Sequence, residues 1–163
     1  MVINTEGSFI DNGITINGAG SAKAQKNLAT DRWWYISSPM SNATASAFPG
    51  LSSSFETGTR LFYWDEVTTH NYVNVTVGTD ALPQLRGYSV KSFPLKSPGL
   101  PVNFIGSLNT GTVGSADNLT RTGTGSFAGY NLVGNPYPSA IDWGSENDTT
   151  LGLTKMNLEP TIW

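Results

Sequence analysis

The sequence predicts an all-β protein, an antiparallel, jelly-roll-like β-sandwich with little helix. Charged residues make up only 13% of the 163 residues, against about 25% in an average soluble protein, whereas Gly (18) and Pro (9) are frequent. No segment repeats apolar residues at i, i+3, i+4 and i+7 over three helical turns. Short apolar runs bounded by turn-forming residues recur instead, and about ten such runs, with turns roughly every 8 to 12 residues, are typical of a sandwich.

The expected strands can be placed in order along the chain. Residues 8–16 (SFIDNGITI) predict a hairpin, because the central Asp-Asn-Gly tolerates the positive φ angles of a tight turn. Further strands are expected at residues 32–37, 60–67, 71–77, 87–93, 102–108, 129–134 and 161–163. Residues 41–58 and 142–157 are polar connections, the second with room for a short helical turn. We divide the chain into an N-terminal hairpin and connection, residues 1–28, and a sandwich module, residues 29–163.

Composition and charge exclude several classes of function. The net charge of −3, without a basic patch, argues against nucleic-acid binding. The chain has no cysteine, which excludes disulfides and a thiol nucleophile, and no apolar run approaches the roughly 18 residues of a membrane span. The start, MVINTEGSF, lacks the charged and apolar regions of a signal peptide. We therefore expect no membrane insertion, and an excised fragment if the parent protein is exported.

The residues that catalysis usually needs are sparse. His70 is the only histidine, so a Ser-His-Asp triad would have to use it, and a zinc site of the His/Cys type is excluded. No G-x-S-x-G motif is present, and we expect His70 to be a solvent-exposed turn residue. Asp65 and Glu66 are adjacent on a predicted strand, so their side chains point to opposite faces and cannot act as a pair. The sequence therefore indicates that the protein is not an enzyme.

The segment GYNLVGNPYPSAIDW, residues 129–143, is dense in prolines and aromatic residues, as either an active site or a sharp corner would be. Pro136 and Pro138 lack backbone donors and restrict the residues before them, so a strand must end here and the chain must bend. Ile141 and Trp143 are expected to pack the bend. The segment contains no nucleophile, general base or phosphate cradle, and we interpret it as a structural corner.

A weak internal repeat links this corner to an earlier segment. Residues 34–43 (WYISSPMSNA) align with residues 131–140 (NLVGNPYPSA) at an offset of 97, which places Pro39 on Pro136. The aromatic run that ends at Trp64 has a counterpart that ends at Trp163. If this unit is repeated, the second copy is incomplete, and we expect an open sheet edge that favours self-association.

Two predicted strands carry three consecutive aromatic residues each. Alternation sends Trp33 and Tyr35 to one face and Trp34 to the other, and it likewise separates Trp64 from Tyr63. One face must be core, whereas flat rings on the other face suit stacking on sugar rings, with amide and hydroxyl side chains for the sugar hydroxyls. The alternative is that both faces are covered. The candidate carbohydrate-binding residues are Trp33, Trp34, Tyr35, Tyr63, Trp64 and Tyr72.

The loop DWGSEND, residues 142–148, brings oxygen ligands close together. Calcium takes six to eight such oxygens, although the spacing is not that of an EF-hand. The candidate metal ligands are Asp142, Glu146, Asn147 and Asp148. The alternative is a solvated acidic loop, and apart from this candidate calcium site we expect no cofactor.

Several blocks of the sequence occur together in a known group of proteins. In chain order these blocks are WWYISSPMSNATASAF, RGYSV, FIGSLNTG, GYNLVGNPYPSAIDW and NLEPTIW, all within residues 8–163. In this order they resemble a module of large secreted and cell-surface proteins of Bacteroidetes that are sorted by the type IX secretion system. The resemblance implies an extracellular or cell-surface location and neighbouring domains in a larger parent protein. It provides no catalytic residues to carry over.

The sequence therefore favours a non-catalytic extracellular module for binding or adhesion, with a polysaccharide or other glycan as the ligand of the exposed aromatic residues. The alternative is a structural spacer or assembly module without a ligand of its own. A degenerate hydrolase domain ranks below both.

Overall fold

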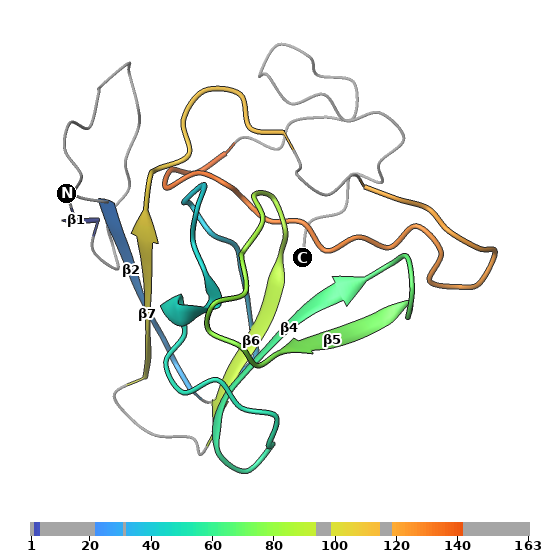
Figure 1. Cartoon of the computed structure of the whole chain (residues 1–163), viewed down its shortest axis with the longest axis horizontal. Helices are drawn as coiled ribbons and strands as arrows, with labels where there is room; N and C mark the ends of the chain where they lie inside the picture. Colours follow the sequence, from blue (N-terminus) through green and yellow to red (C-terminus); the bar gives the residue numbers. More distant parts are fainter. Residues whose placement is uncertain (1, 4–21, 31, 94–98, 115–118, 142–163) are drawn as a thin grey trace.

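The computed structural model describes residues 2–3, 22–30, 32–93, 99–114 and 119–141. Within these ranges seven strands form two sheets that enclose one core, and the predicted all-β sandwich is confirmed (Figure 1). The helical content of the same ranges is a single 3-10 turn, η1 (Ala45–Ala47). The predicted hairpin at residues 8–16 and the terminal strand at residues 161–163 lie outside the described residues.

A four-stranded antiparallel sheet forms one layer. Its order is β3-β6-β4-β5. The strands are β3 (Trp34–Ile36), β4 (Gly58–Asp65), β5 (Asn71–Val75) and β6 (Tyr88–Phe93). Each lies within or close to a strand that the sequence predicts, because all four are rich in the aromatic and β-branched residues that favour a pleated, half-buried surface.

The second sheet has the order β1-β2-β7, with β1 (Val2–Ile3), β2 (Ala22–Leu28) and β7 (Leu100–Gly106). β2 pairs with β7 in antiparallel register along its whole length, whereas β1 pairs with β2 in parallel. The sequence AKAQKNL of β2 has low β propensity, and no strand is predicted there. Its pairing with the strongly apolar β7 decides its conformation, so residues 1–28 contribute a strand to the sandwich.

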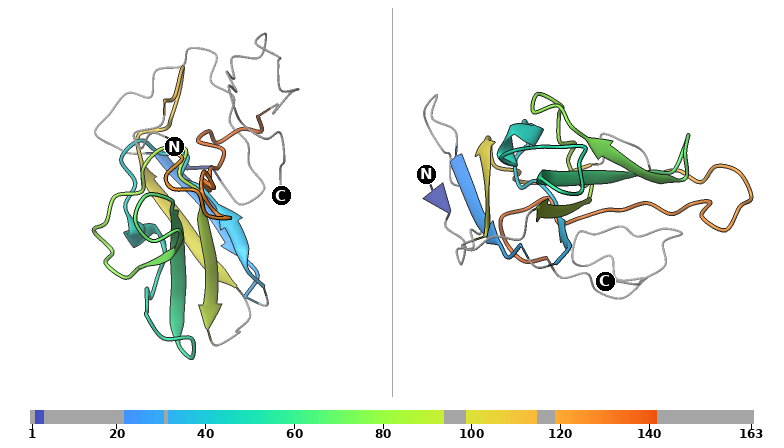
Figure 2. Two further views of the ribbon diagram at one scale, coloured as in Figure 1. Left: turned by 90° about the vertical axis from the view of Figure 1, so that its right-hand side faces the viewer. Right: turned by 90° about the horizontal axis from the view of Figure 1, so that it is seen from below.

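The core lies between the two sheets and beneath the connection from β3 to β4. Figure 2 shows β2 and β7 on one side of this core and β4, β5 and β6 on the other. Leu61 and Val90 of one sheet and Val102 of the other are fully or almost fully buried. The predicted polar connection at residues 41–58 also contributes, because Ala43, Ala45, Ala47 and Phe48 are all buried.

The proline-rich corner is a packed structural element. The predicted strand at 129–134 is reduced to one bridge, Arg86↔Val133. Beyond it, Asn135 Oδ1 accepts from the Tyr137 N–H at 2.9 Å, and Asn135 Nδ2 donates to the Ser139 carbonyl oxygen at 2.6 Å. These bonds let the side chain of Asn135 hold the bend that the prolines begin. Trp143 lies outside the described residues.

Asn109 joins the two segments that the repeat relates. Its N–H donates to the Pro39 carbonyl oxygen at 2.9 Å, and its Nδ2 donates to the Pro136 carbonyl oxygen at 2.7 Å. Asn109 is only 3% exposed, and Ser37 also donates to the Asn135 carbonyl oxygen. The two proline corners therefore meet at one buried residue, Asn109, although the repeat itself stays a prediction.

Candidate functional site

The outer face of the four-stranded sheet carries the aromatic residues that strand alternation directs away from the core. On β4, Leu61 and Tyr63 pack on the core, which leaves Arg60, Phe62 and Trp64 on the opposite face. The inward and outward assignments of the two aromatic runs follow the predicted alternation. The result is a sheet with large rings on both faces.

The outward rings form one continuous series, which we call the aromatic face. Neighbouring ring centroids lie 5.2–6.4 Å apart. The members are Trp33, Phe55, Phe62, Trp64, Tyr72, Phe93, Phe127 and Tyr130, with Tyr35 beside them. Exposed fractions of 41% for Trp33, 59% for Tyr35 and 40% for Tyr72 show that the face is open to solvent. Large exposed apolar surfaces on soluble proteins commonly mark the binding sites of ligands or partner proteins.

Tyr35 and Tyr72 extend the face with hydroxyl groups. Tyr35 lies on β3, and Tyr72 lies on β5, the opposite outer strand of the sheet. Burial, together with the neighbouring Tyr35 hydroxyl, raises the pKa of Tyr72 to about 12. The Tyr72 hydroxyl therefore stays protonated at neutral pH, and the tyrosine hydroxyls of the face can donate or accept hydrogen bonds.

Two cations lie on the aromatic face. The Arg60 guanidinium carbon is 4.1 Å from the centroid of the Phe55 ring and 4.6 Å from that of Phe62. The Lys91 Nζ is 5.2 Å from the centroid of Phe93 and 5.9 Å from that of Trp33. These contacts lie within the range of cation–π attraction, which holds both charges against the rings.

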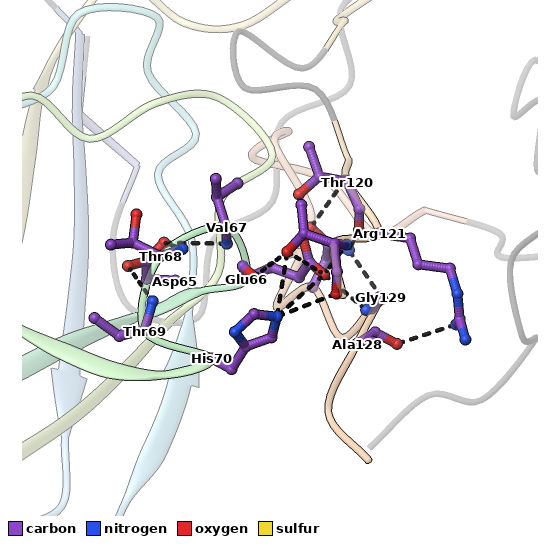
Figure 3. Close-up of polar contacts among 12 residues, drawn as sticks. Asp65, Glu66, Val67, Thr68, Thr69, His70, Thr120, Arg121, Ala128 and Gly129 are labelled. Atoms are coloured by element: carbon purple, nitrogen blue, oxygen red, sulfur yellow. Dashed lines mark hydrogen bonds and ion pairs between the residues drawn. The ribbon is translucent and has the colours of Figure 1, made fainter. Parts of the chain in front are cut away.

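A buried carboxylate fixes the loop that carries the last two rings. Glu66 follows β4 and is 4% exposed. Its Oε1 accepts from the N–H groups of Thr122 and Gly129 at 2.6 and 2.8 Å, and its Oε2 accepts from the Thr120 hydroxyl at 2.5 Å (Figure 3). Burial alone would raise the pKa of Glu66, but these hydrogen bonds outweigh it and lower the pKa to about 2.

The neighbouring Asp65 shapes the turn from which Glu66 projects. Its carboxylate accepts from the N–H groups of Val67, Thr68 and Thr69 at 3.1–3.2 Å. Burial opposes ionisation, but these hydrogen bonds lower the pKa of Asp65 overall. Asp65 therefore closes the β4–β5 turn, while Glu66 points the other way, into the adjacent loop (Figure 3).

The loop at residues 119–130 runs beside the β4–β5 hairpin (Figure 1) and adds to the aromatic face. Within it, Arg121 Nη1 donates to the Ala128 carbonyl oxygen at 3.0 Å, and the Tyr130 N–H donates to the Phe127 carbonyl oxygen at 3.1 Å. The Phe127 ring then lies 5.9 Å from that of Trp64. The Glu66 anchor thus positions two exposed rings, Phe127 and Tyr130, at the end of the aromatic face.

His70 lies in the turn between β4 and β5, as the sequence predicts, but it also contacts this anchor, which corrects the expectation of a solvent-exposed residue. It is half-buried, with a φ of 48°, and its Nε2 lies 3.2 Å from both the carbonyl oxygen and the hydroxyl of Thr122. The same Nε2 is 4.0 Å from Glu66 Oε1. A proton relay needs the nucleophile and the acid on different ring nitrogens, so this arrangement is not a catalytic triad.

The structure brings together four of the six predicted carbohydrate-binding residues. Trp33, Tyr35, Trp64 and Tyr72 lie on the aromatic face. Trp34 and Tyr63 pack against the core on the inner face and are not part of it, because alternation turns them inward. The candidate calcium ligands Asp142, Glu146, Asn147 and Asp148 lie outside the described residues, and the described part of the chain holds no cluster of three or more metal-binding side chains.

Sequence reasoning left several members of the face out of the candidate site. Alternation from Trp64 along β4 leads to Phe62 and Arg60, and alternation along β6 links Lys91 with Phe93, so these could have been found. Phe55 comes from the connection before β4, and Phe127 comes from a loop that Glu66 binds from more than 50 positions away. No local pattern indicates such contacts.

The fold and the aromatic face together define a small β-sandwich domain with one solvent-facing aromatic sheet surface. The chain belongs to the family described as "Domain of unknown function (DUF8693)", whose profile matches residues 1–153. No curated protein and no solved structure shows a significant match to the chain. In the part of the chain that the structure describes, no helix is long and apolar enough to span a membrane.

Proposed function

We propose that the chain is a non-catalytic module that binds glycans on the aromatic face. One observation carries the proposal: a connected series of rings lies on an outer sheet face with Trp33, Tyr35 and Tyr72 substantially exposed. Exposed aromatic rings pack well on the C–H faces of sugar rings, since both surfaces are flat and apolar.

Hydroxyl groups beside the rings support the same ligand class. Tyr35 and Tyr72 are both substantially exposed on the aromatic face. Their hydroxyl groups offer donors and acceptors for sugar hydroxyls. This mixture of rings and neutral polar groups suits a sugar better than it suits a purely apolar ligand.

The orientations of the rings favour one chain of sugars over a flat crystalline surface. Phe55 and Phe62 lie 27° from parallel, whereas the other ring pairs of the face are inclined by 49–83°. A crystalline polysaccharide would need coplanar rings. A single glycan chain can instead turn between successive sugars and contact rings of different inclination.

We further propose that the module acts outside the cell, as part of a large exported or surface protein of Bacteroidetes. The order of the sequence blocks from WWYISSPMSNATASAF to NLEPTIW supports this location. A glycan ligand is consistent with it, because surface proteins meet polysaccharides of other cells and of the host or medium. Calcium at residues 142–148 remains part of the proposal and is tested by adding calcium or a chelator to the binding assay.

A glycan array, together with a pull-down on insoluble polysaccharides, tests the proposed function. The variants Trp33→Ala and Tyr72→Ala each remove one exposed ring, and binding is expected to weaken about tenfold for each, as for other aromatic contacts at interfaces. Ile105→Ala is the matched control, because Ile105 is 57% exposed on the other sheet. Loss of binding in the control, or unchanged binding in both aromatic variants, would contradict the proposal.

A structural spacer is the second candidate, and the mutual packing of the rings favours it. Phe62 and Trp64 are only partly exposed, and a neighbouring domain could cover the rest of the aromatic face. In that case Trp33→Ala would lower the Tm of the parent protein, whereas the isolated chain would bind no glycan. Melting both proteins side by side distinguishes the two functions.

A further inference from the structure

We propose that the ligand is an acidic glycan. Its anionic group, a carboxylate or a sulfate, binds to the Lys91 ammonium, and the positive charge of the neighbouring, buried Arg60 guanidinium favours this binding. This inference rests on the proposed function and narrows it from glycans in general to one chemical class. The site lies on the aromatic face, where β4 and β6 run side by side.

The strand register places the two cations directly opposite each other. Arg60 pairs with Lys91 across β4 and β6. Opposite residues on one face of an antiparallel pair have Cβ atoms about 5 Å apart, and like charges at such positions repel. An anion between or above them would remove this repulsion, so the pair favours a negatively charged ligand.

Arg60 is buried among neutral groups. The residue is only 6% exposed. Its Nη1 donates to the Ser52 carbonyl oxygen at 3.3 Å and to the side-chain amide oxygen of Asn74, also at 3.3 Å. Its Nε is buried and has no hydrogen-bond partner among the residues that the structure describes. The described partners of this charge are therefore neutral acceptors and the rings of Phe55 and Phe62, and the charge raises the electrostatic potential of the surface above it.

Lys91 is more accessible and is the cation that contacts the ligand. It is half-buried, and its described contacts are with the rings of Phe93 and Trp33. An anion at the Lys91 ammonium would lie beside the exposed Trp33 ring. A sugar that stacks on Trp33 can thus place a carboxylate or sulfate substituent on Lys91, since ring and substituent are only a few bonds apart.

The described carboxylates do not neutralise this pair. Asp65 and Glu66 are used in the hairpin turn and in the loop anchor. Glu56 follows Phe55 in sequence, and Asp80 is exposed, but among the described residues no carboxylate forms an ion pair with Arg60 or Lys91. Although the whole chain has a net charge of −3, this part of the aromatic face is positive.

Two pairs of polysaccharides test the charge of the ligand while the sugar stays the same. Polygalacturonate is compared with its methyl-esterified form for the carboxylate, and dextran sulfate is compared with dextran for the sulfate. The intact chain is expected to bind one charged member at least about tenfold more tightly than its neutral partner, the scale of one charge-assisted hydrogen bond. This preference is expected to shrink as salt is added.

Two variants locate the anion. Lys91→Gln is expected to lower the affinity for the charged polysaccharide about tenfold and to leave the neutral one nearly unchanged. Lys23→Gln is the matched control, because it removes the same charge from β2 of the other sheet. Titration of each protein with each polysaccharide provides the comparison, and circular dichroism checks that the variants stay folded.

The outcomes separate this inference from the proposed function. Equal binding of charged and neutral members would overturn the acidic-glycan inference while the proposed function stands. Equal losses in Lys91→Gln and Lys23→Gln would overturn the assignment to this site. If none of the four polysaccharides binds, the acidic-glycan inference is contradicted, and the glycan array decides separately whether the proposed function stands.

Discussion

Glu66 shows how one side chain makes stability depend on pH in a defined direction. Its pKa is about 2 in the folded chain, against 4.5 for the free side chain. Because the folded value is the lower one, its stabilisation is complete above about pH 5 and is lost as the pH falls through 4.5 towards 2. We expect the Tm to fall over this window. Glu66→Gln should lower the Tm at neutral pH and flatten the profile, which circular dichroism melts can measure.

Glu56→Gln is the matched control for this prediction. Glu56 is exposed, and its described hydrogen bond is made by its backbone N–H. The Tm of the Glu56→Gln variant should change with pH in the same way as the Tm of the parent chain. If Glu66→Gln also follows the parent profile, the loop anchor does not contribute to the acid sensitivity.

At the scale of single residues, the sequence predicts which sheet face a side chain points to, but it does not predict which distant residues that side chain contacts. Trp34 and Tyr63 face the core, as alternation requires, since the direction of a side chain depends only on its place in a strand. The sequence alone presents Glu66 as one of two adjacent strand carboxylates, whereas its partners Thr120 and Gly129 lie 54 and 63 positions away. Contacts at such separations depend on how loops pack, which no local pattern records.

At the scale of elements, Asn109 contacts both proline corners. Its backbone N–H binds the first corner, and its side chain binds the second. Asn109→Ala removes the donor to the Pro136 carbonyl oxygen and leaves that buried acceptor without this partner. We expect a loss of about 1–3 kcal/mol in the free energy of unfolding. Urea denaturation measures it, with Asn103→Ala on the preceding strand β7 as the control.

Asn103 is half-exposed on β7, where it accepts a hydrogen bond from Gln25 at 2.9 Å. Its replacement should change the free energy of unfolding by no more than about 0.5 kcal/mol, as for most surface positions. Equal effects of the two substitutions would show that the corners are not held together by Asn109.

The strands also show where prediction from sequence ends. β4, β5, β6 and β7 were predicted because their own residues favour strands. β2 was not, because only Ala22, Ala24 and Leu28 face the core and the residues between them are polar. The segment at 129–134 shows the opposite case: it has an apolar strand pattern, but the structure gives it a single bridge before the chain bends at Pro136.

At the scale of the whole molecule, the position of β2 yields a test of the domain division. A chain that starts at residue 29 lacks β2 and leaves the buried side chains of Leu100, Val102 and Phe104 without their cover and β7 without its partner. We expect this chain to lose its cooperative thermal transition, because both the core and the backbone pairing of one layer are broken.

The control is a chain that starts at residue 22 and keeps β2. It should retain a cooperative transition in circular dichroism, even though the short strand β1 is removed. A cooperative transition with an unchanged Tm in the chain that starts at residue 29 would show that residues 1–28 are separable from the sandwich.

The loop held by Glu66 couples two equilibria that take place on different surfaces. The carboxylate holds the N–H groups of Thr122 and Gly129 in the loop that carries Phe127 and Tyr130, so we expect protonation of Glu66 to loosen the positions of these two rings. A ligand that touches these rings and a proton on Glu66 therefore compete, although they never meet. By reciprocity, the bound ligand lowers the proton affinity of Glu66 by the same factor as the proton lowers that of the ligand. If the proposed ligand contacts these rings, the coupling has no effect at neutral pH, where Glu66 is ionised, and it weakens binding only as the pH falls towards the Glu66 pKa of about 2.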